Sequence, residues 1–147
     1  MRPQAGEAMI SGINDEVILA ARLLLGTLFL IFGWRKLRDY SGTVSQLVQL
    51  RAPVPAVAAV VAIFMELPVA FAVAVGAFAR LAALLLALYC LGTALIGHRY
   101  WTMSAADQVD GMDGFYKDLS IMGGLLLLYL TGAGRYSIDG WCGFGAP

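Results

Sequence analysis

The sequence is poor in charged residues, which make up 14% of its 147 positions, against about 25% in a typical soluble domain. Its ten basic and ten acidic side chains balance, so it lacks the basic excess of a nucleic-acid-binding surface. Hydrophobic residues make up 60% of the chain, and the mean hydropathy is +0.76. This composition excludes an ordinary soluble domain and indicates an integral membrane protein in contact with lipid, with no nucleic-acid partner.

Cysteine and histidine are also scarce. Cys90 and Cys142 lie far apart without a CxxC motif, so we expect two free thiols rather than a disulfide framework or a thiol-redox centre. His98 is the single histidine, so we expect neither a metal site nor a haem bundle, and no covalently bound cofactor. The chain is therefore not expected to have catalytic residues for a redox reaction of its own.

What the sequence has instead is long apolar runs, each near the ~20 residues that cross about 30 Å of hydrocarbon. They lie at about residues 17–34, 56–75, 80–96 and 115–131. Long and short connections alternate between them, so the predicted fold is an all-α membrane protein, an antiparallel four-helix transmembrane bundle. We expect one domain over residues 1–147, with a Gly-rich tail, 132–147, that closes one end.

The connections carry further signals. The stretch VSQLVQL within residues 39–55 predicts a short helix in the membrane interface. Asp15 and Glu16 precede the first run, where a signal peptide has positive charge, so the first helix is expected to be retained. The loop side holds Arg35, Lys36, Arg38, Arg51, Arg99 and Lys117, and the side of the termini holds Arg2, Arg22, Arg80 and Arg135. This bias predicts cytoplasmic loops and external termini.

Charges inside the apolar runs are the main candidates for function, because each costs at least ~2.5–3.5 kcal/mol at the bilayer centre. Arg22 and Glu66 lie roughly 7–8 Å and 13–14 Å from the same end of their spans. An extended arginine side chain bridges that difference, so we expect an Arg22–Glu66 pair. Tyr89 lies at nearly the depth of Glu66 and is expected to donate a hydrogen bond to its carboxylate.

Pro68 removes one backbone donor two residues after Glu66, so the second span should kink there and open room for a ligand or water. Two interpretations of Arg22 and Glu66 remain open. The two side chains either fix the register of the helices, or they serve a ligand or a proton.

A second group of polar and aromatic residues gathers at the loop side. Its members are Trp34, Lys36, His98, Trp101, Tyr116, Lys117 and Asp118. An interfacial aromatic belt explains Trp34, Tyr100 and Trp101. His98 is either a structural residue or a proton donor to a quinone-like headgroup. Gly26, Gly33, Gly123 and Gly124 are expected to let helices approach closely.

The order and spacing of several motifs resemble the DoxX family. The motifs are ARLLLGTLFLIFGWRKL, PVP, ELPVAFAVAVGAFARLAALLLAL, GHRYW, FYKDLSIMGGLLLL and GAGRYSID, which together cover about residues 18–139. The resemblance implies a multi-pass four-helix bundle in the bacterial cytoplasmic (inner) membrane. The family is named for a small subunit of an archaeal terminal quinol oxidase that is linked to thiosulfate:quinone oxidoreduction, and many members have no established activity.

The resemblance also implies a set of recurring polar positions. They fall here on Arg22, Lys36, Glu66, Arg80, His98, Lys117, Arg135, Tyr136, Ser137 and Asp139. Asp118 departs from the family, which more often has asparagine after the lysine. Arg80, Arg135, Tyr136 and Asp139 are interpreted as structural polar residues, with Arg135 and Asp139 in a salt-bridged plug formed by the tail.

Three functions follow from these observations. The first is a small integral subunit of a bacterial membrane oxidoreductase complex, which anchors a redox-protein partner and contacts quinone. The second is a stand-alone binder or carrier of a small apolar molecule, and the third is a purely structural membrane anchor. The residues that the first function assigns to a ligand are Arg22, Lys36, Glu66, Tyr89, His98, Trp101, Lys117 and Asp118.

Overall fold

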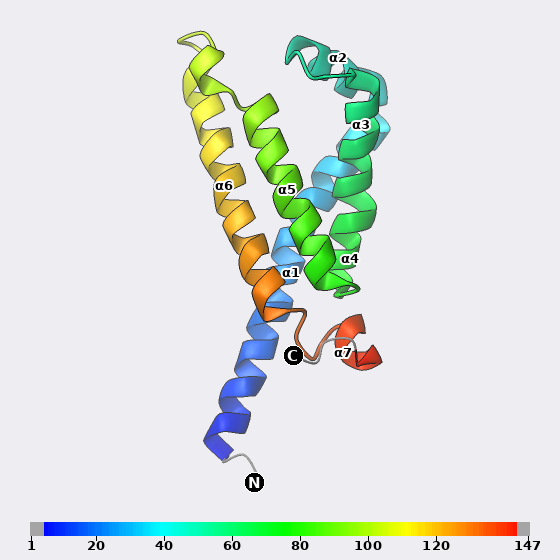
Figure 1. Cartoon of the computed structure of the whole chain (residues 1–147), viewed down its shortest axis with the longest axis vertical. Helices are drawn as coiled ribbons and strands as arrows, with labels where there is room; N and C mark the ends of the chain where they lie inside the picture. Colours follow the sequence, from blue (N-terminus) through cyan, green and yellow to red (C-terminus); the bar gives the residue numbers. More distant parts are fainter. Residues whose placement is uncertain (1–4, 144–147) are drawn as a thin grey trace.

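The computed structural model of the chain describes residues 5–143, in which helices are joined by turns and loops and there is no strand (Figure 1). The long helices are α1 (Ala5–Arg38), α5 (Ala79–Gly97) and α6 (Gln108–Thr131). A further long helix is continuous through α3 (Pro55–Phe64), η1 (Met65–Val69) and α4 (Ala70–Val75). The short elements are α2 (Tyr40–Gln49), η2 (Tyr100–Thr102) and α7 (Ile138–Cys142). The predicted all-α class is confirmed.

Three segments of the described chain are long and apolar enough to cross a membrane. They are Asn14–Arg38, Pro55–Val75 and Ala79–Thr102, and they match the first three predicted spans. The fourth predicted span lies inside α6, which is not among them. Lys117 and Asp118 interrupt the apolar run of α6 and lower its hydropathy.

Two helices begin earlier than the hydropathy pattern predicts. Helix α1 has 34 residues, or about 51 Å at 1.5 Å per residue, so it extends well beyond the hydrocarbon layer. Helix α6 begins at Gln108, where Asp107 and Asp110 suit the positive end of the helix dipole. Hydropathy marks only the apolar part of a helix, so α1 and α6 both begin before the residues at which their apolar runs begin.

The short helix expected in the first connection is present as α2. The Asp39 side chain caps it by accepting a hydrogen bond from the Gly42 amide at 3.0 Å. The disturbance expected at Pro68 takes the form of the π-helical segment η1, in which the proline sits. Such π-helical turns absorb an irregular residue inside a helix and are frequent at functional sites.

Small residues set the packing between the helices. Helices α5 and α6 run side by side along most of their length, while α1 packs along η1 and α4 (Figure 1). A Cβ atom at Gly26 would lie 2.8 Å from that of Ala74, and one at Gly33 would lie 2.8 Å from that of Glu66. The close approach expected at these two glycines is confirmed. The prediction is wrong for Gly123, because a Cβ atom added there would meet no atom of the described residues within 4 Å.

The tail folds back onto the α4–α5 turn, as the sequence predicts. The Asp139 amide donates to the carbonyl oxygen of Gly76 at 2.9 Å. The Asp139 carboxylate accepts hydrogen bonds from the amides of Phe78 and Ala79, both at 2.8 Å. Helix α7 therefore closes this end of the molecule and supplies hydrogen-bond acceptors at the start of α5. The last four residues of the predicted tail, 144–147, lie outside the described part of the chain.

Candidate functional site

The most buried ion pair of the described chain is centred on Glu66. Lys36 Nζ lies 2.6 Å from both carboxylate oxygens, and the Tyr89 hydroxyl donates to Oε1 at 2.5 Å. Lys36 comes from α1, Glu66 from η1 and Tyr89 from α5, so three elements meet at one carboxylate. We call Lys36, Glu66 and Tyr89 the Glu66 cluster. The predicted Tyr89 hydrogen bond to this carboxylate is confirmed.

The expected Arg22–Glu66 pair is wrong. Arg22 is fully buried beside Gly76 at the tail end, where its Nη2 donates to the carbonyl oxygen of Tyr136. Its Nε and Nη1 have no hydrogen-bond partner in the described part of the chain. The sequence-based depths took Arg22 to reach toward the middle of the membrane, whereas the returning tail meets it at its own end.

Gly33 explains why Lys36 takes the place expected of Arg22. The missing side chain at Gly33 lets α1 approach η1 directly at Glu66. Lys36 follows Gly33 by three residues and therefore lies on the same face of α1, one turn further along. Its ammonium group reaches back to Glu66 and also lies 5.8 Å from the centre of the Phe32 ring.

A second polar group joins α5 to α6 around Asp118. The hydroxyl of Thr93 donates to Asp118 Oδ2 at 2.8 Å, and His98 Nε2 lies 3.8 Å from the same oxygen. The His98 ring packs against Gly114 of α6, where a side chain would collide with it, so the glycine leaves space for the imidazole. We call Thr93, His98 and Asp118 the Asp118 group. Thr93 was not predicted, although its spacing of four residues from Tyr89 places both on one face of α5.

The Glu66 cluster and the Asp118 group lie close together between the helices. Asp118 is near enough to Lys36 and to Tyr89 for electrostatic interaction with both. Tyr89 and Thr93 stand one helical turn apart, so the Asp118 group continues the Glu66 cluster toward the loop end. Together they form one polar band that draws on α1, η1, α5 and α6.

Three of the predicted ligand residues lie outside this band: Arg22 at the tail end, and Trp101 and Lys117 at the loop side. Trp101 is exposed and packs edge-on against Tyr100 and Phe115, with ring centroids 5.2 Å and 5.8 Å away. This arrangement agrees with an interfacial aromatic belt. Lys117 is exposed and lines a shallow surface depression of about 420 Å³ together with Asp113, Tyr116 and Ser120.

The predicted structural residues gather at the tail end, but they are held mainly by backbone groups. The Arg135 amide donates to Asp15 Oδ1 at 3.1 Å, while its guanidinium Nε is 4.0 Å from Oδ2 of that residue. Arg80 is exposed and borders Gly132. Asp139 binds the amides of the α4–α5 turn instead of forming the predicted salt-bridged plug with Arg135. Asp15 was not predicted, because an acidic residue before an apolar run has many explanations.

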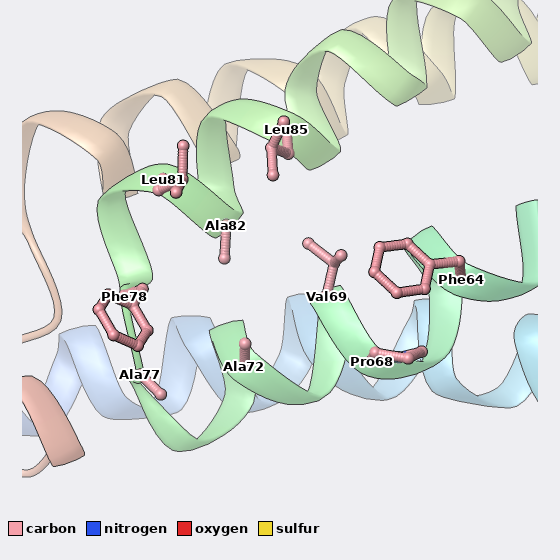
Figure 2. A pocket seen from close by; sticks show the side chains of 9 residues that line it. All are labelled: Phe64, Pro68, Val69, Ala72, Ala77, Phe78, Leu81, Ala82 and Leu85. Carbon is pink, nitrogen blue, oxygen red and sulfur yellow. The ribbon is translucent and has the colours of Figure 1, made fainter. Parts of the chain in front are cut away.

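An apolar groove runs along the same two elements that carry Glu66 and Tyr89. It has a volume of about 260 Å³ and is lined by Phe64, Pro68, Val69, Ala72, Ala77, Phe78, Leu81, Ala82 and Leu85. Figure 2 shows Val69, Ala72 and Ala82 between the facing helices, with Phe64 and Phe78 at the two ends. Its lining residues do not include Lys36, Glu66 or Tyr89, so the groove is a separate feature of the helices that carry Glu66 and Tyr89. In the described residues, no three His, Cys, Asp or Glu side chains are grouped so as to hold a metal ion.

Comparison with known proteins agrees with this architecture. Residues 17–99 match the family model described as DoxX. The chain is 42% identical to inner membrane protein YphA of Escherichia coli (strain K12) over 123 residues, which cover 84% of this chain and 88% of the relative. It is 35% identical to inner membrane protein YqjF of the same strain over 127 residues, which cover 86% and 92% of the two chains. No solved structure gives a significant match.

Both relatives are inner membrane proteins by name, and three helices of this chain suit a membrane crossing. The predicted multi-pass location in the bacterial inner membrane is confirmed. The match over more than half of the chain and the two relatives establish the predicted family as well. The chain belongs to the DoxX family.

Proposed function

We propose that the chain is a small integral subunit of an inner-membrane oxidoreductase complex, in which it anchors a redox-protein partner and contacts the headgroup of quinone. The observation that carries this proposal is the Glu66 cluster, a buried carboxylate with donors from two other helices. An ion pair at this depth gives little net stability compared with apolar side chains of similar size. Its presence therefore favours a role beyond packing.

The cluster has the chemistry that a quinone headgroup requires. A carbonyl oxygen of the headgroup needs hydrogen-bond donors, and Tyr89 O–H and Lys36 N–H are both poised on one carboxylate. The apolar groove between the α3–η1–α4 helix and α5 suits an isoprenoid chain, because its lining is hydrocarbon and includes the small residues Ala72 and Ala82. Quinone, when bound, supplies two-electron redox chemistry; this chain contributes binding, orientation and proton exchange.

The proposal includes α6 as a fourth membrane span. Its 24 residues extend about 36 Å, and it packs along α5 over much of that length. Lys117 and Asp118 lie near the loop end of α6, where Asp118 turns toward the polar band. The result is an antiparallel four-helix bundle, a single domain with cytoplasmic loops and external termini.

A structural role for the Glu66 cluster is the competing function. Both oxygens of Glu66 accept hydrogen bonds within the cluster, and these bonds connect α1, η1 and α5. They could therefore serve only to hold the three elements together. Glu66→Gln separates the two functions. The variant keeps an acceptor for Tyr89 but loses the negative charge.

The experiment is purification of the tagged chain from its native membranes in mild detergent. We expect redox-protein subunits to co-purify, and we expect Glu66→Gln to retain them while the complex loses quinone-linked turnover. Asp113→Asn, on the exposed side of α6, is the matched control and should keep both. A chain that purifies without a redox protein contradicts the subunit role, and a Glu66→Gln complex that falls apart supports the structural role.

A further inference from the structure

Polar side chains at successive turns of α5 contact polar residues of the neighbouring helices. Tyr89 contacts Glu66 on η1, and four residues later Thr93 contacts Asp118 on α6. His98, at the end of α5, lies 3.8 Å from the same Asp118 oxygen. Residues four apart on a helix have Cβ atoms about 5–6 Å apart. This series of polar contacts therefore extends from the loop end of α5 to the middle of the membrane.

The exposure of these side chains falls along the same line. The His98 side chain is 39% exposed, that of Asp118 is 17% exposed, and that of Glu66 is 6% exposed. His98 thus meets solvent at the loop end, and Asp118 stands between it and the buried cluster. A simple structural ion pair at a helix end would not require this graded continuation into the interior.

Each titratable side chain in this series can both accept and donate a proton. Imidazole, carboxyl and phenol groups are the usual carriers of protons in proteins. The titratable groups that interact electrostatically with Asp118 are Lys36, Tyr89, Cys90, His98 and Lys117. Lys36 and Lys117 offset part of the negative charge of Asp118 and Glu66, which favours passage of a proton without a large net charge.

We propose that His98 and Asp118 form a proton-exchange path from the loop-side surface to the Glu66 cluster. His98 accepts a proton from water, and a bridging water carries one from its Nε2 across the 3.8 Å to Asp118 Oδ2. Asp118 passes a proton to the Tyr89 oxygen across one turn of α5, a step that a bridging water spans. Tyr89 gives its own hydroxyl proton to Glu66 Oε1, so one proton moves inward and no electron moves.

The path extends the proposed function. A quinone headgroup takes up two protons with two electrons, and the electrons come from the redox partner of the complex. The use of the path for quinone chemistry therefore rests on the proposed function. Its existence as a route for protons does not, and an experiment on the chain alone tests it.

The test measures hydrogen–deuterium exchange of the Tyr89 hydroxyl by infrared spectroscopy, on the purified chain in lipid nanodiscs. The Tyr89 band is isolated as the difference between the wild type and Tyr89→Phe. We expect prompt exchange in the wild type and exchange about 10²-fold slower in Asp118→Asn, the usual effect of losing one positioned proton carrier. The asparagine keeps an acceptor for Thr93, so the fold is preserved.

Two further variants keep the test decisive. His98→Gln removes the outermost carrier and should also slow the exchange, whereas Asp113→Asn on the exposed side of α6 should leave it unchanged. Equal exchange rates in the wild type and in Asp118→Asn would overturn the path, as would equal slowing in the Asp113 control. Absence of bound quinone from the complex would overturn the proposed ligand and leave these rates as they are.

Discussion

Lys36 and Glu66 meet between α1 and η1, with the ammonium nitrogen 2.6 Å from each carboxylate oxygen. This contact depends on Gly33, which brings the two helices together one turn earlier on α1. It also depends on the π-helical segment around Pro68, which holds Glu66 inside the molecule. Gly33 and Pro68 thus allow the Lys36–Glu66 ion pair to form inside an otherwise apolar protein.

Removing one partner of this pair should be costly. Glu66→Gln leaves Lys36 without its counter-charge, and we expect a loss of about 3 kcal/mol in unfolding free energy, near the low end for a buried pair because Lys36 is 28% exposed. Titration with denaturing detergent measures this loss. The double variant Glu66→Gln, Lys36→Gln should recover much of it, and a double variant as unstable as the single one would contradict a coupled pair.

The close approach of α1 to η1 gives a second prediction. In Gly33→Ala the new Cβ atom would lie 2.8 Å from the Cβ of Glu66, so we expect a loss of about 1–3 kcal/mol from overpacking. Gly123→Ala is the matched control, because no atom lies within 4 Å of its new Cβ. The control should gain about 0.5–1 kcal/mol from reduced backbone entropy. Similar stability changes for the two variants, measured in the same detergent titration, would show that the contact at Gly33 is absent.

The tail gives a third prediction. Asp139→Ala removes the acceptor for two amides at the start of α5, and the loss of such a cap costs about 0.5–2 kcal/mol. The tail should also detach more often, so that trypsin cleaves faster after the exposed Arg135. Thermal unfolding and a digestion time course measure the two effects. An Asp139→Ala protein with wild-type stability and wild-type digestion would argue against the tail as a cap.

The orientation gives a fourth prediction. Cys142 is exposed on α7 and Cys90 is buried, so a membrane-impermeant thiol reagent should label the chain at one position. The basic bias of the loops predicts that Cys142 reacts in intact cells from outside the inner membrane, once the outer membrane is made permeable. Cys142→Ser is the control that should remove the label. Labelling only after the inner membrane is opened would reverse the orientation.

Hydropathy and spacing predicted much of the fold. The first three spans, the short helix α2, the disturbance at Pro68 and the return of the tail are all confirmed. These features follow from local signals: apolar length, a proline and a Gly-rich end. The early starts of α1 and α6 were missed because a helix continues past the membrane wherever its polar residues still favour a helix.

The site was harder to predict, because partner choice depends on contacts between helices. Depth alone favoured Arg22 as the partner of Glu66, whereas the close approach at Gly33 selects Lys36. Arg22 instead meets Tyr136, and no hydropathy pattern shows that a tail folds back onto a buried arginine. Thr93 was missed for a similar reason, because its role depends on a hydrogen bond to Asp118 on a different helix.

The proposed contact between the Glu66 cluster and a quinone headgroup can be measured directly by organic extraction and ultraviolet spectroscopy of the native complex, with the wild type and Tyr89→Phe purified side by side. We expect quinone to co-purify with the wild type and to be depleted in Tyr89→Phe, which loses the hydroxyl donor and keeps the ring. Absence of quinone from both the isolated chain and its native complex, or equal retention in the two proteins, would contradict the proposed contact.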